Sequence, residues 1–298
     1  MTDPTRRWLE VHARAAVTPD VGVLLADALV SAGARGVEER MGSYVAWFEE
    51  PEDAEDFVTG LSHDLAIQSG LPGLVLTHSW RDHADWAELW KQGLAPRRVT
   101  DRIVVHPSWA PPEDVRPGDI VLSIDPGMAF GTAEHGTTRG CLRLLDGRVE
   151  QGSRLLDIGS GSGILAMAAV GLGAAHVTAI EADALAVEAL HENVEMAGAS
   201  DSVEVLHARA TADSIAAYPG VDGIVANLER GLLLPLIVGT AQALGPGRWL
   251  IVSGILEEEW EGVARTIEEH GFSLAEVDAD DGWRSGCFAR QAAGEARA

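Results

Sequence analysis

Short apolar segments alternate with helical stretches over the last two thirds of the chain. The apolar segments are about five residues long and end at glycine or polar residues, a pattern that is typical of strands. We expect strands at residues 154–158, 177–181, 203–207, 223–227, 249–253, 273–278 and 287–290, and helices at 163–171, 184–197, 232–244 and 257–270. Because such alternation implies a mostly parallel sheet covered on both faces, it predicts an α/β, doubly wound, seven-stranded Rossmann-like domain.

The first eighty residues carry a different order of elements. The pattern predicts strands at residues 8–13, 37–40, 44–48 and 74–80 and helices at 20–32 and 53–69. The two middle strands would form a hairpin. The order βαββαβ predicts a small ferredoxin-like α+β domain. No combination of its residues suggests a reaction, so we expect this domain to serve substrate recognition or packing.

A connector is expected between these two parts. Trp86 and Trp90 lie one helical turn apart in a short predicted helix at residues 85–91, which indicates a packed apolar stripe. A strand is expected at 102–106, and prolines punctuate the segment that follows it. The sequence therefore divides into a recognition domain (1–80), a connector (81–124) and a catalytic domain (125–298).

Composition narrows the class of protein. Hydrophobic residues make up 46% of the 298 residues, which is enough for a core, and no stretch reaches the ~18 apolar residues that cross a bilayer. The first residues lack the order of a signal peptide, and Cys141 and Cys287 allow at most one disulfide. We therefore expect a cytoplasmic protein without membrane contacts. The histidines are scattered, so we expect no metal site.

The charge of the chain is strongly acidic. Forty-six Asp and Glu residues against 22 Lys and Arg residues give a net charge of −24. Such a surface repels phosphates, so we expect no direct binding of nucleic acid. It attracts a basic partner. A second interpretation, that the acidity serves only solubility, stays open.

Residues 157–163, with the sequence DIGSGSG, join a buried predicted strand to a helix. Glycines let a ligand approach the backbone, and ligands of open α/β sheets bind at such a turn. A nicotinamide-binding loop has the spacing GxGxxG and holds a pyrophosphate at the helix N-terminus. Here the spacing is GxGxG, and an acid precedes it that would repel a pyrophosphate but suits an ammonium and a sulfonium. The loop predicts S-adenosylmethionine as the cofactor, bound at Asp157, Gly159 and Gly161.

Two polar residues end further predicted strands. Glu181 follows the glycine loop by one helix and strand, and its carboxylate can accept hydrogen bonds from both ribose hydroxyls of an adenosine. Without the glycine loop before it, Glu181 would be interpreted as a solvated charge at the end of a strand. Asn227 ends the fourth predicted strand, and its amide oxygen can aim the lone pair of an amine at a methyl carbon. An Asn there is also an ordinary turn residue. We expect Glu181 to bind ribose and Asn227 to be the catalytic residue.

Residues 125–138, DPGMAFGTAEHGTT, are rich in glycine and hydroxyl groups and precede a helix that we expect to begin near Arg139. One interpretation is a plain loop with a Thr N-cap. The other is a lid over the methionine end of the cofactor.

These segments together resemble the ribosomal protein methyltransferase family PrmA. The resemblance extends over residues 82–290 and the order of elements before them. Family members carry DPGxAFGTGxHxTT, then DxGxGSGILA, then an acid after the second strand, then VANIL. The chain matches at residues 125–132, His135, Thr137, Thr138, 157–166, Glu181 (commonly Asp in the family) and 226–227, and its segment 253–256 is similar to the SGIL of the family.

The resemblance implies an S-adenosylmethionine-dependent enzyme that methylates amino groups of the stalk-base protein of the large ribosomal subunit. The acceptors would be lysine side chains and the N-terminus. The partner would be a basic ribosomal protein, and we expect a monomeric enzyme. The implied cofactor contacts are Thr138, Gly159, Glu181 and Asn227, and the implied substrate contacts are Phe130, His135 and Trp283, although Trp283 could simply pack.

Two departures from the family pattern concern the acceptor. Ala133 stands where the family has Gly, and Leu228-Glu229-Arg230 replaces Ile-Leu-Ala. Arg230 would either repel an incoming lysine or pair with Glu229. Two alternatives therefore remain: an enzyme that methylates another protein or a small amine, and a binding module without catalysis, against which the intact cofactor motifs argue.

Overall fold

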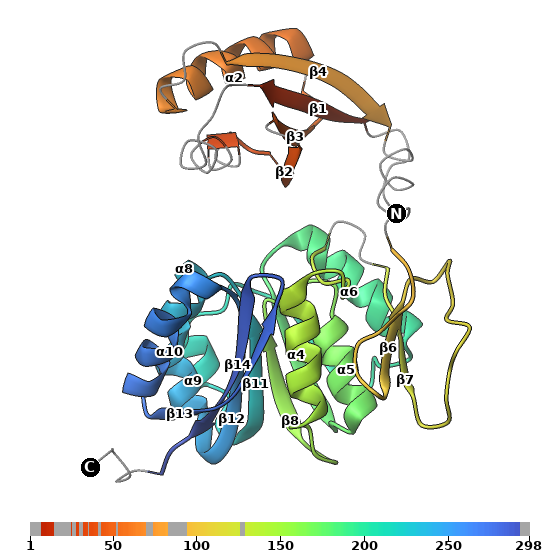
Figure 1. Cartoon of the computed structure of the whole chain (residues 1–298), viewed down its shortest axis with the longest axis vertical. Coiled ribbons are helices and arrows are strands. Elements are labelled where there is room, and N and C mark those ends of the chain that lie inside the picture. Colours follow the sequence, from red (N-terminus) through yellow and green to blue (C-terminus); the bar gives the residue numbers. More distant parts are fainter. Residues whose placement is uncertain are drawn as a thin grey trace. The chain divides into compact units, whose positions relative to one another are not determined.

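The computed structural model describes residues 7–14, 25, 28–29, 32–34, 36–40, 43–51, 53–69, 74–82, 94–125 and 129–292. The chain divides into two compact units, Met1–Gly93 and Leu94–Ala298, whose elements are labelled in Figure 1. In these described ranges, no helix is long and apolar enough to cross a membrane. The same ranges hold no group of three or more His, Cys, Asp or Glu side chains placed to hold a metal ion.

The first unit contains a four-stranded antiparallel sheet with the order β2-β3-β1-β4. Its elements are β1 (Arg7–Arg14), β2 (Gly36–Arg40), β3 (Ser43–Glu49), α2 (Ala54–Ser69) and β4 (Val75–Asp82). The predicted hairpin is confirmed, since Val37 of β2 pairs with Ala46 of β3. Leu9 and Val11 of β1 share one face and are fully buried in the same core as Leu61 and Leu65 of α2.

Two predicted helices are mostly or wholly outside the described residues. Of the helix expected at 20–32, Leu25, Ala28, Leu29 and Ala32 are described, and the side chains of the first three are buried in the core of the first unit. The helix expected at 85–91, with Trp86 and Trp90, lies wholly outside the described residues.

The second unit is built on a seven-stranded sheet with the order β10-β9-β8-β11-β12-β14-β13. Neighbouring strands from β10 to β12 are parallel, and β14 is antiparallel to both β12 and β13. The strands are β8 (Arg154–Ile158), β9 (His176–Glu181), β10 (Val203–His207), β11 (Val221–Asn227), β12 (Leu244–Leu256), β13 (Phe272–Asp280) and β14 (Trp283–Arg290). This arrangement confirms the predicted mostly parallel sheet.

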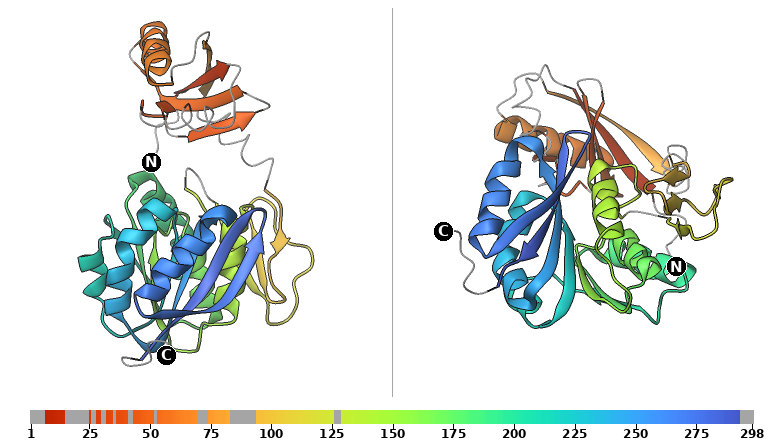
Figure 2. Two further views of the ribbon diagram at one scale, coloured as in Figure 1. Left: turned by 60° about the vertical axis from the view of Figure 1, so that its left-hand side comes forward. Right: turned by 60° about the horizontal axis from the view of Figure 1, so that its bottom comes forward.

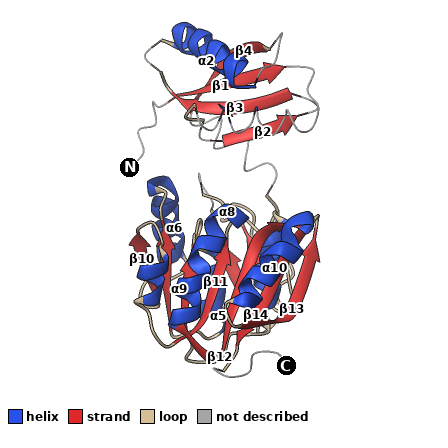
Figure 3. Cartoon of the chain, turned by 90° about the vertical axis from the view of Figure 1, so that its left-hand side faces the viewer, coloured by secondary structure: helices blue, strands red, loops and turns tan. Residues whose placement is uncertain are grey.

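Helices cover both faces of this sheet. They are α4 (Gly136–Asp146), α5 (Ile164–Leu172), α6 (Ala184–Met196), α7 (Ala212–Ala216), α8 (Arg230–Leu233), α9 (Ile237–Ala243) and α10 (Trp260–Glu269). Figure 1 shows α4, α5 and α6 against one face and α8, α9 and α10 against the other. The left view of Figure 2 and Figure 3 turn this second face toward the viewer.

The alternation of side chains along β8 explains the two cores. Leu155 packs into the core under α4, α5 and α6, whereas Leu156 packs into the core under α8, α9 and α10. Both side chains are almost completely buried. Burial of such a side chain stabilises the fold by about 1.5–3 kcal/mol, so a central strand apolar on both faces holds the layers together.

The connector prediction needs correction. Residues 94–124 belong to the second unit, where β5 (Arg97–Arg98), β6 (Ile103–His106) and β7 (Ile120–Ser123) form a small sheet. The buried side chains Ile103, Val105 and Leu122 join the core under α4 and α5. Because these apolar side chains pack there, this segment is an extension of the large domain.

Two helix predictions also need correction. The helix expected at 232–244 is divided into α8, a 3-10 turn (Leu234–Leu236) and α9, because Pro235 has no N–H for a helical hydrogen bond. The helix expected near Arg139 begins at Gly136, and its N-cap is His135 rather than a Thr. The imidazole of His135 accepts from the backbone N–H of Thr137.

Candidate active site

A cavity of ≈ 400 Å³ lies at the carboxyl ends of β8, β9, β10 and β11. The chain passes from β8 to β9 on one side of β8, while β11 lies on the other side, so the cavity sits where the strand order reverses. Open α/β sheets bind their ligands at such a switch point. The lining residues are Ala129, Phe130, Ile158, Gly159, Gly161, Ile180, Glu181, Ala182, Asp183, Ala186, Ala208, Arg209, Ala210, Asn227, Leu228, Leu232 and Leu236.

The glycine loop leaves its backbone open to this cavity. Gly159 and Gly161 have φ angles of 72° and 53°, in the left-handed region that favours glycine. A Cβ on Gly161 would lie 2.4 Å from the backbone oxygen of Phe130. The neighbouring residue, Ser162, donates its N–H to this same oxygen at 2.8 Å. Any larger residue at Gly161 would therefore separate the two loops that meet at the cavity.

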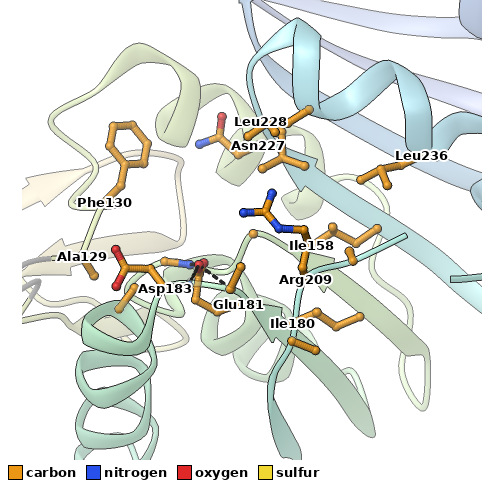
Figure 4. Close-up of a pocket in the computed structure, with 17 residues that line it drawn as sticks. Ala129, Phe130, Ile158, Ile180, Glu181, Asp183, Arg209, Asn227, Leu228 and Leu236 are labelled. Carbon is orange, nitrogen blue, oxygen red and sulfur yellow. Dashed lines mark hydrogen bonds between the residues drawn. The ribbon is translucent and has the colours of Figure 1, made fainter. Parts of the chain in front are cut away.

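The carboxylate of Glu181 is held in one orientation by backbone N–H groups. Oε2 accepts from the N–H of Gly161 at 2.9 Å, and Oε1 accepts from Ala182 at 2.7 Å and Asp183 at 2.9 Å (Figure 4). A carboxylate offers about four acceptor positions, so Oε2 keeps room for a further donor. This residue can therefore bind a hydroxyl without moving, as ribose binding requires.

Asp157 and Thr138 do not line the cavity but carry buried polar atoms that need partners. Asp157 is fully buried, and within the described part of the chain neither of its carboxylate oxygens has a hydrogen-bond partner. The same holds for the hydroxyl of Thr138 at the start of α4. Burial raises the pKa of Asp157 to about 7. Buried groups without partners are costly, and an ammonium group would satisfy a carboxylate here. These unpaired oxygens thus fit the ammonium at the methionine end of S-adenosylmethionine.

Asn227 is oriented by a chain of hydrogen bonds. Its Nδ2 lies 3.2 Å from Oγ1 of Thr137, and this hydroxyl lies 2.8 Å from Nδ1 of His135. The N–H of Thr137 also points to Nδ1, so Nδ1 accepts, and the Thr137 hydroxyl donates to it and accepts from Asn227. Burial lowers the pKa of His135, so its ring is neutral at pH 7. The amide oxygen of Asn227 is left to accept a hydrogen from an amine.

The three residues expected to contact a substrate lie together at this end. The ring centres of Phe130 and His135 are 5.2 Å apart, and those of His135 and Trp283 are 4.9 Å apart. Phe130 is 56% exposed, so this aromatic group faces solvent at the mouth of the cavity. In Figure 4, Phe130 and Asn227 lie at the upper end of the cavity, and Glu181 lies at the lower end. An alkyl amine entering here would contact aromatic rings before it reached Asn227.

Ion pairs fix α4 against β13, next to the turn that leads to Trp283. Arg139 contacts both carboxylate oxygens of Asp280, and Arg143 contacts both of Asp278 and one of Asp280, all at 2.6–2.8 Å. The hydrogen bond from Arg139 holds the pKa of Asp280 well below its usual range. Since α4 carries Thr137, these pairs also hold the residue whose hydroxyl contacts Asn227.

Comparison with known families agrees with this geometry. A family model described as ribosomal protein L11 methyltransferase (PrmA) matches residues 8–291. The chain belongs to the PrmA family. A relative from Symbiobacterium thermophilum, named ribosomal protein L11 methyltransferase, is 41% identical over 207 residues, which are 68% of this chain and 65% of that relative. One of the same name from Pelotomaculum thermopropionicum is 39% identical over 218 residues, 72% of this chain and 68% of the relative. The first of these matches spans less than two thirds of the relative's length.

A solved structure supports the same conclusion for the fold. The crystal structure of a ribosomal protein L11 methylase from Lactobacillus delbrueckii subsp. bulgaricus is 27% identical to this chain, with a TM-score of 0.60. The match covers 66% of this chain and 100% of the solved one. This chain therefore shares an α/β fold with that solved methylase.

The first departure from the PrmA pattern has a visible structural consequence. Ala133 has a φ of +62°, in the left-handed region, and its side chain is buried. Glycine adopts this conformation without strain, whereas an L side chain there costs about 1–2 kcal/mol. The loop keeps the conformation that suits Gly although an Ala stands in it.

The second departure concerns the charge of Arg230, which the sequence left either to repel a lysine or to pair with Glu229. Arg230 does not pair with Glu229 among the described residues. Its guanidinium lies 3.7 Å from the carboxylate of Glu259, at the start of α10. Glu229 is the N-cap residue of α8, but its side chain makes no capping hydrogen bond. The charge of Arg230 is thus partly balanced by Glu259 rather than by Glu229.

Sequence reasoning missed two residues of this site. Asn193 of α6 is fully buried, and its Nδ2 donates to the backbone oxygens of Asp125 at 3.1 Å and Ser162 at 2.9 Å. It therefore ties the segment that precedes the lid loop to the glycine loop. The second is Arg209, which lines the cavity beyond β10. Neither residue belongs to a motif, and a buried Asn within an apolar helix was the one available signal.

Proposed function

We propose that this chain transfers methyl groups from S-adenosylmethionine to amino groups of ribosomal protein L11, lysine side chains first among them. The observation that carries the proposal is the orientation of Asn227, whose Nδ2 is bound to Thr137 at the acceptor end of the cavity. The names of the PrmA relatives supply the protein substrate. The net charge of −24 favours a basic partner of this kind.

The cofactor supplies an activated methyl group on a sulfonium, and the residues of the chain bind the cofactor and align the acceptor amine. Glu181 accepts hydrogen bonds from the ribose hydroxyls, and the loop at Gly159 and Gly161 lets the cofactor lie against the backbone. The carboxylate of Asp157 and the hydroxyl of Thr138 would hold the ammonium of the methionine end, since neither group has a hydrogen-bond partner among the described residues. Each contact satisfies a polar group that the fold leaves available, so the bound position follows from the chain itself.

The acceptor amine must arrive neutral, because an ammonium has no free lone pair. An unperturbed lysine has a pKa of about 10.4, so deprotonation limits the reaction near pH 7. The Oδ1 atom of Asn227 accepts an N–H of the neutral amine and fixes the direction of its lone pair. Such alignment contributes to the rate because misplacement by about 1 Å can cost ~100-fold. The rings of Phe130, His135 and Trp283 contact the apolar part of the lysine side chain.

We also propose that the first unit recognises the protein substrate. Its antiparallel sheet order β2-β3-β1-β4 and its helix α2 support the ferredoxin-like assignment. Every residue that we assign to the cofactor lies in the second unit. We therefore expect residues 94–298 alone to bind cofactor but to lose methylation of the protein substrate.

The test uses ribosomal proteins that have not been methylated. The full chain is incubated with methyl-labelled S-adenosylmethionine and unmethylated ribosomes, and the labelled protein is identified. Label in ribosomal protein L11 supports the proposal, and label in another protein or in a small amine would replace the substrate while keeping the reaction. A chain that binds the cofactor but labels nothing would contradict the catalytic role.

A further inference from the structure

Arg209 lines the cavity, but the reaction described above assigns it no role. It follows the end of β10 by two residues, and its neighbours Ala208 and Ala210 line the cavity with it. Figure 4 shows its guanidinium inside the cavity, between Glu181 below it and Asn227 above it. In the part of the chain that the structure describes, its side chain has no hydrogen bond or ion pair, and no other lining residue carries a positive charge.

The carboxylates nearest in the cavity wall are already engaged. Glu181 accepts three backbone N–H groups, and Asp183 caps α6 by accepting from the N–H of Leu185 at 2.8 Å. Neither carboxylate lies within ion-pair distance of Arg209 in the described structure. The guanidinium is therefore available to a ligand.

The position of Glu181 decides which part of the cofactor meets this guanidinium. With the ribose at Glu181, the base would lie against the part of the wall formed by the end of β9, the start of α6 and the residues that follow β10. The apolar residues of this part are Ile180, Ala182, Ala186, Ala208 and Ala210. The carboxylate of Asp183 beside them is engaged in capping α6, so Arg209 is the one lining side chain there whose polar group has no partner among the described residues.

We propose that the guanidinium of Arg209 stacks on the adenine ring of the bound cofactor and so contributes affinity for the base. A guanidinium is planar and weakly hydrated, and it stacks on aromatic faces, where the negative face of the ring attracts its charge. A lysine ammonium keeps the charge but lacks the plane. This inference rests on the proposed function, since it requires an adenosine cofactor in this cavity.

The experiment compares two ligands that share the base and the ribose. Binding of S-adenosylhomocysteine and of 5′-methylthioadenosine, which lacks the amino acid, is measured by calorimetry with the full chain. The variants are Arg209→Met and Arg209→Lys, and the control is Arg265→Met, which removes an exposed arginine of α10 outside the cavity. Circular dichroism melting checks that each variant folds.

Stacking predicts the same loss for both ligands, about three- to tenfold, in Arg209→Met and in Arg209→Lys, with no change in the control. Unchanged affinity in Arg209→Met would overturn the inference. Wild-type affinity in Arg209→Lys would overturn it as well, since charge alone would then suffice. If the wild-type chain bound neither ligand, the cofactor assignment itself would fail, an outcome that differs from both of these.

Discussion

Replacing Asp157 by asparagine is expected to stabilise the second unit above pH 7 and to weaken cofactor binding at the same time. Both effects have one origin. The carboxylate is fully buried and has no hydrogen-bond partner among the described residues, and its burial raises its pKa to about 7. In the unfolded chain the pKa is near 3.9.

The sign of the stability effect follows from these two values. Below about pH 4 the carboxyl is protonated in both states, and its ionisation costs nothing. As the pH rises toward 7, the unfolded chain releases the proton first, so the free energy of unfolding falls, and the loss is complete above pH 7. A pKa difference of about 3 units corresponds to a loss on the order of 4 kcal/mol. Asparagine does not ionise, and its own unpaired amide costs about 1–3 kcal/mol.

The net gain at pH 8 is therefore about 1–3 kcal/mol, or a rise in Tm of about 5 °C for a unit of this size. At pH 4 the carboxyl of the wild type is neutral, so only the cost of the unpaired amide remains, and the variant should be about 1–3 kcal/mol less stable than wild type. Binding should change in the opposite direction. S-adenosylhomocysteine loses a charged hydrogen bond worth about 1.5–3 kcal/mol, which is roughly a 10- to 150-fold weaker affinity. The affinity of 5′-methylthioadenosine should stay unchanged, because it has no ammonium.

The assay combines thermal unfolding at pH 4 and pH 8 with calorimetry of the two ligands. Asp157→Glu serves as a control that keeps the charge. An Asp157→Asn variant that melted no higher than wild type at pH 8 would refute the reasoning about burial. Equal losses for the two ligands would refute the contact between Asp157 and the ammonium.

Three further substitutions test other contacts. Glu181→Ala should weaken both S-adenosylhomocysteine and 5′-methylthioadenosine by about 2–3 kcal/mol in calorimetry, since both ligands contain the ribose; a loss confined to one ligand would contradict ribose binding. Asn227→Ala should lower the single-turnover rate by about 100-fold with little change in cofactor affinity, and Thr137→Val should lower it less; a normal rate at saturating cofactor would leave Asn227 as a cofactor ligand alone. Ala133→Gly should relieve about 1–2 kcal/mol of backbone strain and lose about 0.8 kcal/mol from the burial of the methyl group. Urea unfolding should therefore show a free energy of unfolding that is up to about 1 kcal/mol higher. A clear decrease would show that the buried methyl group contributes more than the backbone strain costs.

Much of the fold could be predicted because local pattern determines it. Strand β8 is apolar on both faces and ends in a glycine loop, and its predicted and observed ends coincide. The strands β5 and β7 could not be predicted, because segments of two to four residues become strands only by pairing with β6. The missing N–H of Pro235 marks the break between α8 and α9, although the apolar pattern continues across the proline.

The site was predictable where a motif carried it. The sequence placed Glu181 and Asn227 at strand ends, and the structure places both at one cavity, although their roles stay proposals. The links among Asn227, Thr137 and His135 depend on how α4 packs beside β11, which spacing does not reveal. Arg209 was missed for the same reason, since its place in the cavity comes from the pairing of β10 with β9.

Methylation of ribosomal protein L11 is tested most directly by intact-mass analysis of the purified, unmethylated protein after incubation with the full chain and S-adenosylmethionine. We expect mass increases by whole methyl groups on amino groups, lysine residues among them, and a strong reduction of the rate with Asn227→Ala. An unchanged mass of ribosomal protein L11, with a folded chain that binds S-adenosylhomocysteine, would contradict it.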